Sequence, residues 1–88
     1  MKLNPNFVTY ESRGEYFIVD TSNTKFQGIV KNNETAAFIV ECLKTETTQS
    51  AIVDKLLAEY TGADRPTVER DVKNVISTLR GIGAVIGK

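Results

Sequence analysis

Short clusters of apolar and aromatic residues, separated by turn formers, make up the first third of the chain. Phe7–Glu11 and Glu15–Asp20 are rich in β-branched and aromatic side chains, which favour strands. The connection Ser12-Arg13-Gly14 lies between them, and its glycine can adopt a positive φ without steric cost. The pattern therefore predicts a β-hairpin.

A third strand is predicted at Phe26–Lys31, after a polar turn cluster at residues 21–24. Gly28 within this strand indicates a bulge or a close approach of another backbone. The third strand of such an arrangement lies at the edge of its sheet, where unpaired N–H and C=O groups can accept an extended peptide. The alternative is that the C-terminal tail or Lys31 protects this edge.

From Asn32 onward, apolar residues recur at helical spacing and predict three helices. The first covers Glu34–Leu43 and is capped by Asn32 or Asn33. The second covers Gln49–Tyr60, with Thr48 as its N-cap and Gly62 suited to the position after its end. These helices can cover one face of the sheet.

The third helix has Pro66 in its first turn and extends to about Arg80. The tail at residues 81–87 alternates apolar residues with glycines and either adds a short strand or covers the edge of the core. Three strands followed by three helices give one α+β domain spanning residues 1–88.

Helical geometry separates two groups of residues on the third helix. At about 100° per residue, one group falls within about 60° of arc and is the predicted centre of the buried face; it comprises Val68, Val72, Val75 and Leu79. Ile76 lies to one side, next to a flank formed by Glu69, Lys73 and Arg80. An apolar residue beside mixed charges is common at the rim of a peptide groove. The alternative is that Ile76 is peripheral core and the charges are solvated.

Composition narrows the function classes. The 88 residues include 11 Lys and Arg and 11 Asp and Glu, so the formal net charge is zero, which argues against attachment to nucleic acid or anionic lipid by bulk charge. The absence of His and the single cysteine, Cys42, exclude Ser–His and Cys–His nucleophiles and zinc sites with several Cys or His ligands. No apolar run reaches membrane-spanning length. We expect a cytoplasmic protein without enzymatic activity, metal or cofactor, in which Cys42 belongs to the core or its boundary.

Two other functions fit the helical pattern. Two short helices followed by a longer one are compatible with a helix-turn-helix, whose third helix would contact DNA. Along that helix the cations Arg65, Arg70, Lys73 and Arg80 alternate with Asp64, Glu69 and Asp71. A DNA-binding winged helix needs cations that are not offset in this way. A self-associating domain, a homodimer that pairs its exposed edge with a second copy, is the other alternative.

Two segments of the chain resemble one known family. The segments are NNETAAFIVECLKTETTQSAIVDKLLAEY and VERDVKNVISTLRGIGAV, with Gly28-Ile29-Val30-Lys31 directly before them. They share an Asn-x-Thr-Ala opening of the first helix, a Thr-Thr opening of the second and a tyrosine closing it. An Asp-Val pair inside the third helix and a Leu-x-x-x-Gly close follow. Over about residues 6–86, the chain resembles the PqqD family, named for coenzyme PQQ synthesis protein D.

This resemblance implies a winged helix-turn-helix-like fold and a role as a peptide chaperone. Members of the family bind the leader of a ribosomally synthesised precursor peptide, without a cofactor, and present it to a modifying enzyme, often a radical SAM protein. The leader adds as a strand to the third strand and lies against the third helix. Carried over by position, the peptide-binding residues are Phe26, Gln27, Gly28, Ile29, Val30 and Lys31 on the strand and Glu69, Val72, Lys73, Ile76 and Arg80 on the helix.

Overall fold

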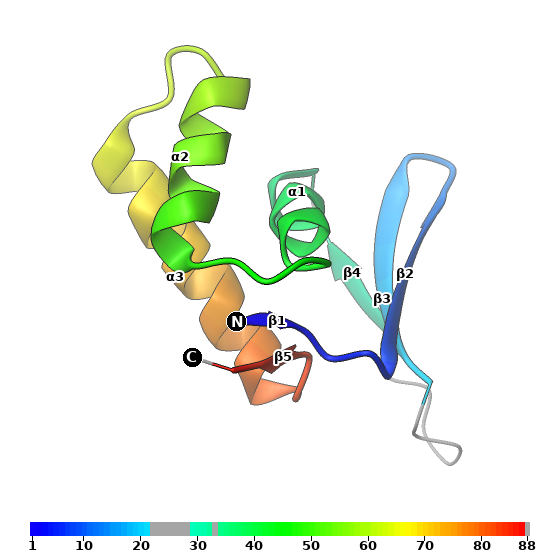
Figure 1. Cartoon of the computed structure of the whole chain (residues 1–88). Coiled ribbons are helices and arrows are strands. Elements are labelled where there is room, and N and C mark those ends of the chain that lie inside the picture. Colours follow the sequence, from blue (N-terminus) through cyan, green and yellow to red (C-terminus); the bar gives the residue numbers. More distant parts are fainter. Residues whose placement is uncertain (22–28, 33, 88) are drawn as a thin grey trace.

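A computed structural model describes residues 1–21, 29–32 and 34–87, with the backbone alone in 29–32. The elements in chain order are β1 (Lys2–Leu3), β2 (Phe7–Ser12), β3 (Glu15–Asp20), β4 (Ile29–Asn32), α1 (Glu34–Cys42), α2 (Gln49–Glu59), α3 (Arg65–Gly81) and β5 (Val85–Ile86) (Figure 1). The predicted α+β class is confirmed, with three helices and small antiparallel sheets. No helix in the described part of the chain combines the length and apolar character needed to cross a bilayer.

The hairpin forms where the pattern predicts it. β2 and β3 pair in antiparallel register from Phe7–Asp20 to Ser12–Glu15, and β4 pairs with the other side of β3. Arg13 and Gly14 form the turn, and both have positive φ, +54° and +79°. A two-residue turn with positive φ at both positions matches the twist of the flanking strands. The sequence pointed to Gly14, while the strained Arg13 could not be inferred from its residue type.

A second, smaller sheet joins the two ends of the chain. Lys2 pairs with Ile86 and Leu3 with Val85 in an antiparallel β1–β5 pair, so both termini lie beside each other (Figure 1). The tail therefore forms a short strand, one of the two predicted arrangements. Its partner β1 was not predicted, because two residues carry no periodicity.

Capping side chains set the starts of α2 and α3. The Thr48 hydroxyl accepts the Ala51 N–H at 3.1 Å, as predicted. A carboxylate oxygen of Asp64 accepts the Thr67 N–H at 3.0 Å, a cap that the sequence pattern did not predict. α3 therefore begins at Arg65, one residue before Pro66, and each cap satisfies an N–H group that the helix leaves unpaired.

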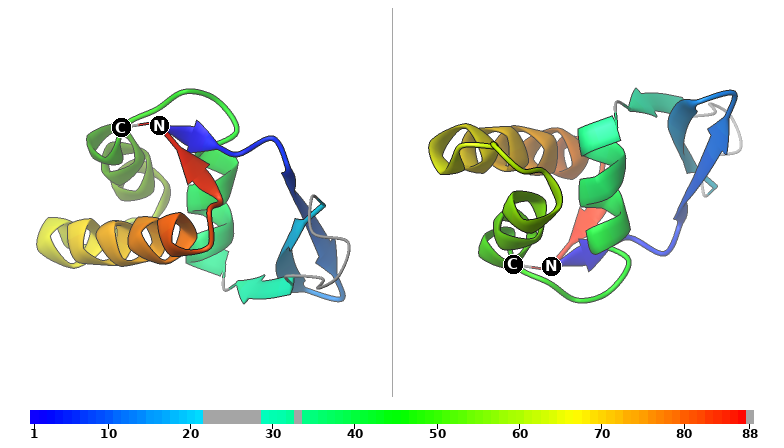
Figure 2. Two further views of the ribbon diagram at one scale, coloured as in Figure 1. Left: turned by 90° about the horizontal axis from the view of Figure 1, so that it is seen from below. Right: turned by 90° about the horizontal axis from the view of Figure 1, so that it is seen from above.

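The core lies where α1 meets α2 and α3 (Figure 2). α1 stands between this helical pair and the three-stranded sheet (Figure 2). The largest fully buried side chains are Ile18, Ile39, Val40, Leu43, Ile52, Val53 and Val72. All but Ile18 come from the helical part of the chain, so the helices supply most of the buried apolar surface that stabilises the fold.

The buried face of α3 differs from the predicted one. Ile76 is buried with 5% of its surface exposed, whereas Val75 is half-buried. The buried residues Val68, Val72, Ile76 and Leu79 span about 80° of arc, turned toward Ile76. α1, α2 and β5 all pack against α3, so neighbours on several sides widen the covered face beyond the centre of its apolar stripe.

Candidate functional site

β4 lies at an edge of the three-stranded sheet, as predicted for the third strand. The strand order is β2-β3-β4, so β3 occupies one side of β4 only. Of the six predicted strand residues, Ile29, Val30 and Lys31 lie in β4. Phe26, Gln27 and Gly28 lie outside the described residues, and so does the predicted bulge at Gly28.

The register indicates which backbone groups of β4 point outward. The residue pair that closes a two-residue hairpin turn exchanges backbone hydrogen bonds, and bonded and non-bonded pairs alternate along an antiparallel ladder. In this hairpin the closing pair is Ser12 and Glu15. Along β3 from Glu15, the backbone N–H and C=O groups point alternately toward β2 and toward β4, so those of Ile18 point toward β4 and bond with Val30. The N–H and C=O groups of Ile29 and Lys31 are therefore directed away from β3, toward the open edge.

The charged residues of α3 differ from one another in their contacts. Glu69 is exposed and forms an ion pair with Arg65, from Nε to Oε1 at 3.3 Å. Lys73 is exposed and has no ion-pair partner in the described ranges. Arg80 is exposed, as expected, and its Nη1 also donates to the Gly87 carbonyl at 2.9 Å. Arg80 thus holds the tail that carries β5.

Val72 and Ile76 do not present side-chain surface at this site. Val72 is fully buried and Ile76 has 5% exposure, so both belong to the core, and the alternative that placed Ile76 in the core is the correct one. α1 packs against both β4 and α3. β4 and α3 therefore both lie against α1, and Val72 and Ile76, the apolar side chains assigned to the groove, lie in the core.

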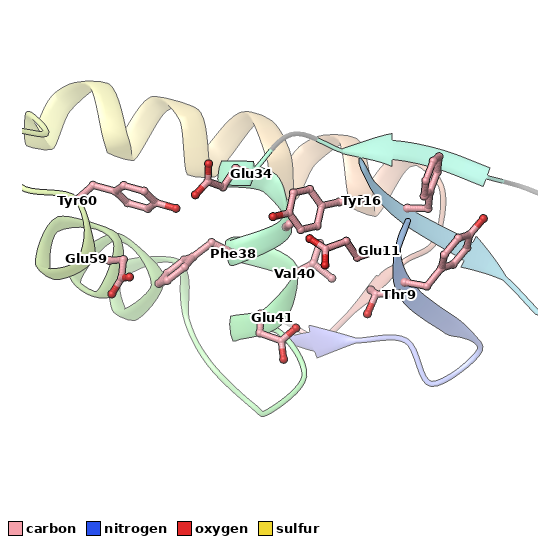
Figure 3. A pocket seen from close by; sticks show the side chains of 12 residues that line it. Thr9, Glu11, Tyr16, Glu34, Phe38, Val40, Glu41, Glu59 and Tyr60 are labelled. Carbon is pink, nitrogen blue, oxygen red and sulfur yellow. The ribbon is translucent and has the colours of Figure 1, made fainter. Parts of the chain in front are cut away.

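A cleft that the sequence did not predict lies between the sheet and α1, with a cavity volume of about 420 Å³. Tyr16 from β3, Phe38 from α1 and Tyr60 after α2 are among its aromatic lining residues (Figure 3), together with the stacked pair Tyr10 and Phe17. The four acidic residues that line it are Glu11, Glu34, Glu41 and Glu59. Spacing could have indicated this face of α1, because Glu34, Phe38 and Glu41 follow at intervals of four and three.

The cleft carries a negative field. The Tyr16 hydroxyl is hydrogen-bonded to the Glu11 carboxylate, which raises the pKa of Tyr16 because the negative charge stabilises the protonated phenol. Partial burial, followed by the charges of Glu34 and Glu59, raises the pKa of Tyr60. Phe38 meets Tyr60 edge to face, with ring centroids 5.9 Å apart. The aromatic surface and the carboxylates are thus combined in one concave site.

Cys42 has the surroundings of a packing residue. It is half-buried against the core, as predicted. Burial raises the pKa of its thiol, which disfavours the nucleophilic thiolate. In the described part of the chain, no three side chains among Cys, Asp and Glu are grouped to hold a metal ion.

Comparison with solved structures finds similar chains. A structure of TbiB1 in complex with the TbiA(beta) leader peptide is 25% identical, with a TM-score of 0.81, over 100% of this chain and 98% of that one. A lasso peptide synthetase B1 complexed with the leader peptide is 22% identical, with a TM-score of 0.78, over 98% of this chain and 96% of that one. The second likeness shows the shared fold.

Sequence comparison identifies the family. Curated proteins give no match to the chain. The family model of coenzyme PQQ synthesis protein D (PqqD) matches residues 10–85, nearly the whole chain. The motifs that carried the resemblance in the helical part of the sequence lie within this range. The chain therefore belongs to the PqqD family.

Proposed function

We propose that this protein is a recognition element for the leader of a ribosomally synthesised precursor peptide. The observation that carries the proposal is the likeness, over the whole chain, to TbiB1 in complex with a leader peptide. Family membership supports the same role. Binding of this kind needs an accessible strand edge and side chains that select the peptide, and it needs no catalytic group.

The leader adds as a strand to the open edge of β4. Ile29 and Lys31 offer the backbone groups that an incoming strand pairs with, because the register directs them away from β3. Strand addition gives affinity through backbone hydrogen bonds, and neighbouring side chains give specificity. The exposed Glu69 and Lys73 on α3 supply charges that select the leader and steer its approach.

The proposal includes the remaining expectations from the sequence. The chain acts as one winged helix-turn-helix-like domain, with α2 and α3 as the packed helix pair and the hairpin β2–β3 as the wing. It has no activity of its own and presents the bound precursor to a modifying enzyme such as a radical SAM protein. Pairing of β4 with a second copy would use the same edge and would compete with the leader.

A proline substitution in β4 tests the edge directly. We expect Ile29→Pro to weaken binding of the leader at least about tenfold, because it removes an outward N–H, and to leave the melting temperature nearly unchanged, since proline is tolerated at the first residue of an edge strand. The matched control Val30→Pro removes an N–H that faces β3 and lowers the melting temperature. Fluorescence polarisation with a labelled leader from the precursor gene nearest this gene measures the affinity.

An NMR titration with the same leader maps the contact. Shifts in Ile29–Asn32 and around Lys73 support strand addition at β4. Shifts confined to the hairpin turn or to α2 would reject it. Lys73→Glu is expected to change the association rate and its salt dependence more than the stability, because the side chain is exposed. Sedimentation at two concentrations distinguishes leader binding from edge-to-edge self-association.

A further inference from the structure

The cleft beneath the sheet is a second concave surface, separate from the open edge of β4. Its walls come from β2, β3, α1 and the end of α2, and β2 is the opposite edge strand of the sheet. Figure 3 shows Tyr16 and Glu11 on the sheet side and Glu34, Phe38 and Tyr60 on the helical side of the same space. The cleft thus extends to the β2 edge of the sheet, whereas the proposed position of the leader is the β4 edge.

Most of the acidic side chains of the cleft have no compensating charge among the described residues. No Lys or Arg is among the described residues that line it. Glu41 is paired with Lys44 at 2.9 Å, but Glu34 and Glu59 have no ion-pair partner in the part of the chain that the structure describes. The hydrogen bond to Glu11 is the main cause of the raised pKa of Tyr16 and burial that of Tyr60, and the charges of neighbouring glutamates raise both pKa values further. A cationic occupant complements this surface.

The aromatic walls specify the kind of cation. A guanidinium group stacks on aromatic faces and bonds carboxylates with two parallel N–H donors, whereas an ammonium group does neither as well. Phe38 and Tyr60 offer ring surface, and Glu34 and Glu59 lie beside Tyr60 (Figure 3). A cavity of about 420 Å³ accommodates side chains of a peptide segment.

We infer that this cleft is a docking site for an arginine side chain on an exposed segment of a second protein. A second protein is assigned as the occupant because the leader is proposed to lie on β4, whereas the cleft extends to β2, the other edge strand of the sheet. The assignment of the second protein as the enzyme that receives the precursor rests on the proposed function. The arginine preference rests on the cleft alone.

The probe is the blocked peptide acetyl-Gly-Arg-Gly-Arg-Gly-amide, titrated into the labelled full chain and followed by NMR. Its control has citrulline in place of both arginines, which keeps the shape and removes the charge. We expect saturable shifts at Tyr16, Phe38 and Tyr60 with the arginine peptide and none with the citrulline peptide. The double variant Glu34→Gln/Glu59→Gln is expected to weaken binding about fivefold.

Two further variants keep the test falsifiable. Phe38→Leu leaves every charge in place and is expected to weaken binding about threefold through the loss of ring contact. Asp71→Asn removes an exposed acidic residue of α3 that lies outside both the cleft and the proposed leader-binding flank, and it is expected to leave binding of the arginine peptide unchanged. Equal binding of both peptides, shifts elsewhere on the chain or full affinity in the double variant would overturn the inference.

The two proposals can fail independently. A leader that does not bind, with the arginine peptide still bound in the cleft, rejects the proposed function and supports the cleft. A leader that binds β4 with no response to the arginine peptide rejects the cleft and leaves the proposed function intact.

Discussion

The α2–α3 pair and the three-stranded sheet use apolar residues in opposite ways. α2 buries Ile52, Val53 and Leu56, and it packs against α3, whose apolar face is also buried. Among the described side chains of the sheet, only Phe7 and Ile18 are buried, while Val8 and Tyr10 are 46% and 47% exposed. Stability is therefore concentrated in the helices, and the sheet keeps much of its surface accessible.

The sheet depends on local pairing instead. β2 and β3 pair along their whole length, and Tyr10 stacks on Phe17 with ring centroids 5.0 Å apart. Local pairing of this kind leaves the outer strands free to accept another chain. The helices thus supply most of the stability, and the sheet keeps an edge strand accessible. Binding by strand addition uses such an edge.

The sharpest test of this comparison truncates apolar residues in both regions. Leu56→Ala and Ile76→Ala are each expected to cost about 2–5 kcal/mol of unfolding free energy, because both side chains are buried, at 2% and 5% exposure. Val8→Ala on the sheet is expected to cost less than about 1 kcal/mol, because Val8 is half exposed. Urea denaturation measures all three.

Ile76 is the informative member of this set. If Ile76→Ala lowers the unfolding free energy as little as Val8→Ala does, Ile76 is not a core residue. The sequence-based assignment of Ile76 to the rim of the peptide groove would then be favoured. A cost for Val8→Ala close to that of Leu56→Ala would contradict the contrast between the two regions.

Local signals predicted most of the elements. β3 spans Glu15–Asp20 as predicted, α2 begins after the Thr48 cap, and Gly14 forms the hairpin turn. These features depend on a few neighbouring residues, so periodicity, capping and turn chemistry are enough to find them.

Features that depend on distant contacts were missed or misplaced. The burial of Ile76 rather than Val75 depends on how several elements surround α3, and the β1–β5 pair joins residues more than eighty positions apart. The aromatic cleft combines Tyr16, Phe38 and Tyr60 from separate elements. Spacing within one helix predicts a face, and only the packing shows what that face meets.

Replacing glycine with alanine at two exposed positions compares the backbone of the hairpin with that of α3. Gly14 has φ +79° in the hairpin, and an added Cβ would meet no atom within 4 Å. Any loss of stability in an alanine variant therefore comes from the backbone conformation and not from a steric clash. Gly14→Ala is expected to cost about 1–2 kcal/mol, since an L side chain disfavours this left-handed conformation. Gly81 ends α3 with the same open space and without positive φ.

Gly81→Ala is therefore the matched control. It is expected to stabilise the protein by about 0.5 kcal/mol, because alanine lowers the entropy of the unfolded chain and fits the helix. Thermal unfolding of the two variants gives shifts of opposite sign. Shifts of the same sign would contradict the assignment of the cost at Gly14 to its positive φ.

The smallest expected effect is a pH dependence at the start of α3. The Thr67 hydroxyl and N–H both donate to the Asp64 carboxylate, which lowers the pKa of Asp64 below its ordinary value of 3.8. A lowered pKa in the folded state adds stability that is present above the unfolded pKa and is lost as the pH falls through the folded pKa.

Asp64→Asn keeps an N-cap acceptor but does not titrate. We expect the advantage of the wild type over this variant to be constant from pH 7 to about pH 5 and to shrink below about pH 4. Other acidic residues, including Glu46, whose pKa is lowered mainly by its hydrogen bond to the N-terminal amine, titrate in both proteins and cancel in the difference. Urea denaturation of both proteins across this range measures it, and a difference that stays constant down to pH 3 would show that the charge of Asp64 does not contribute to the cap.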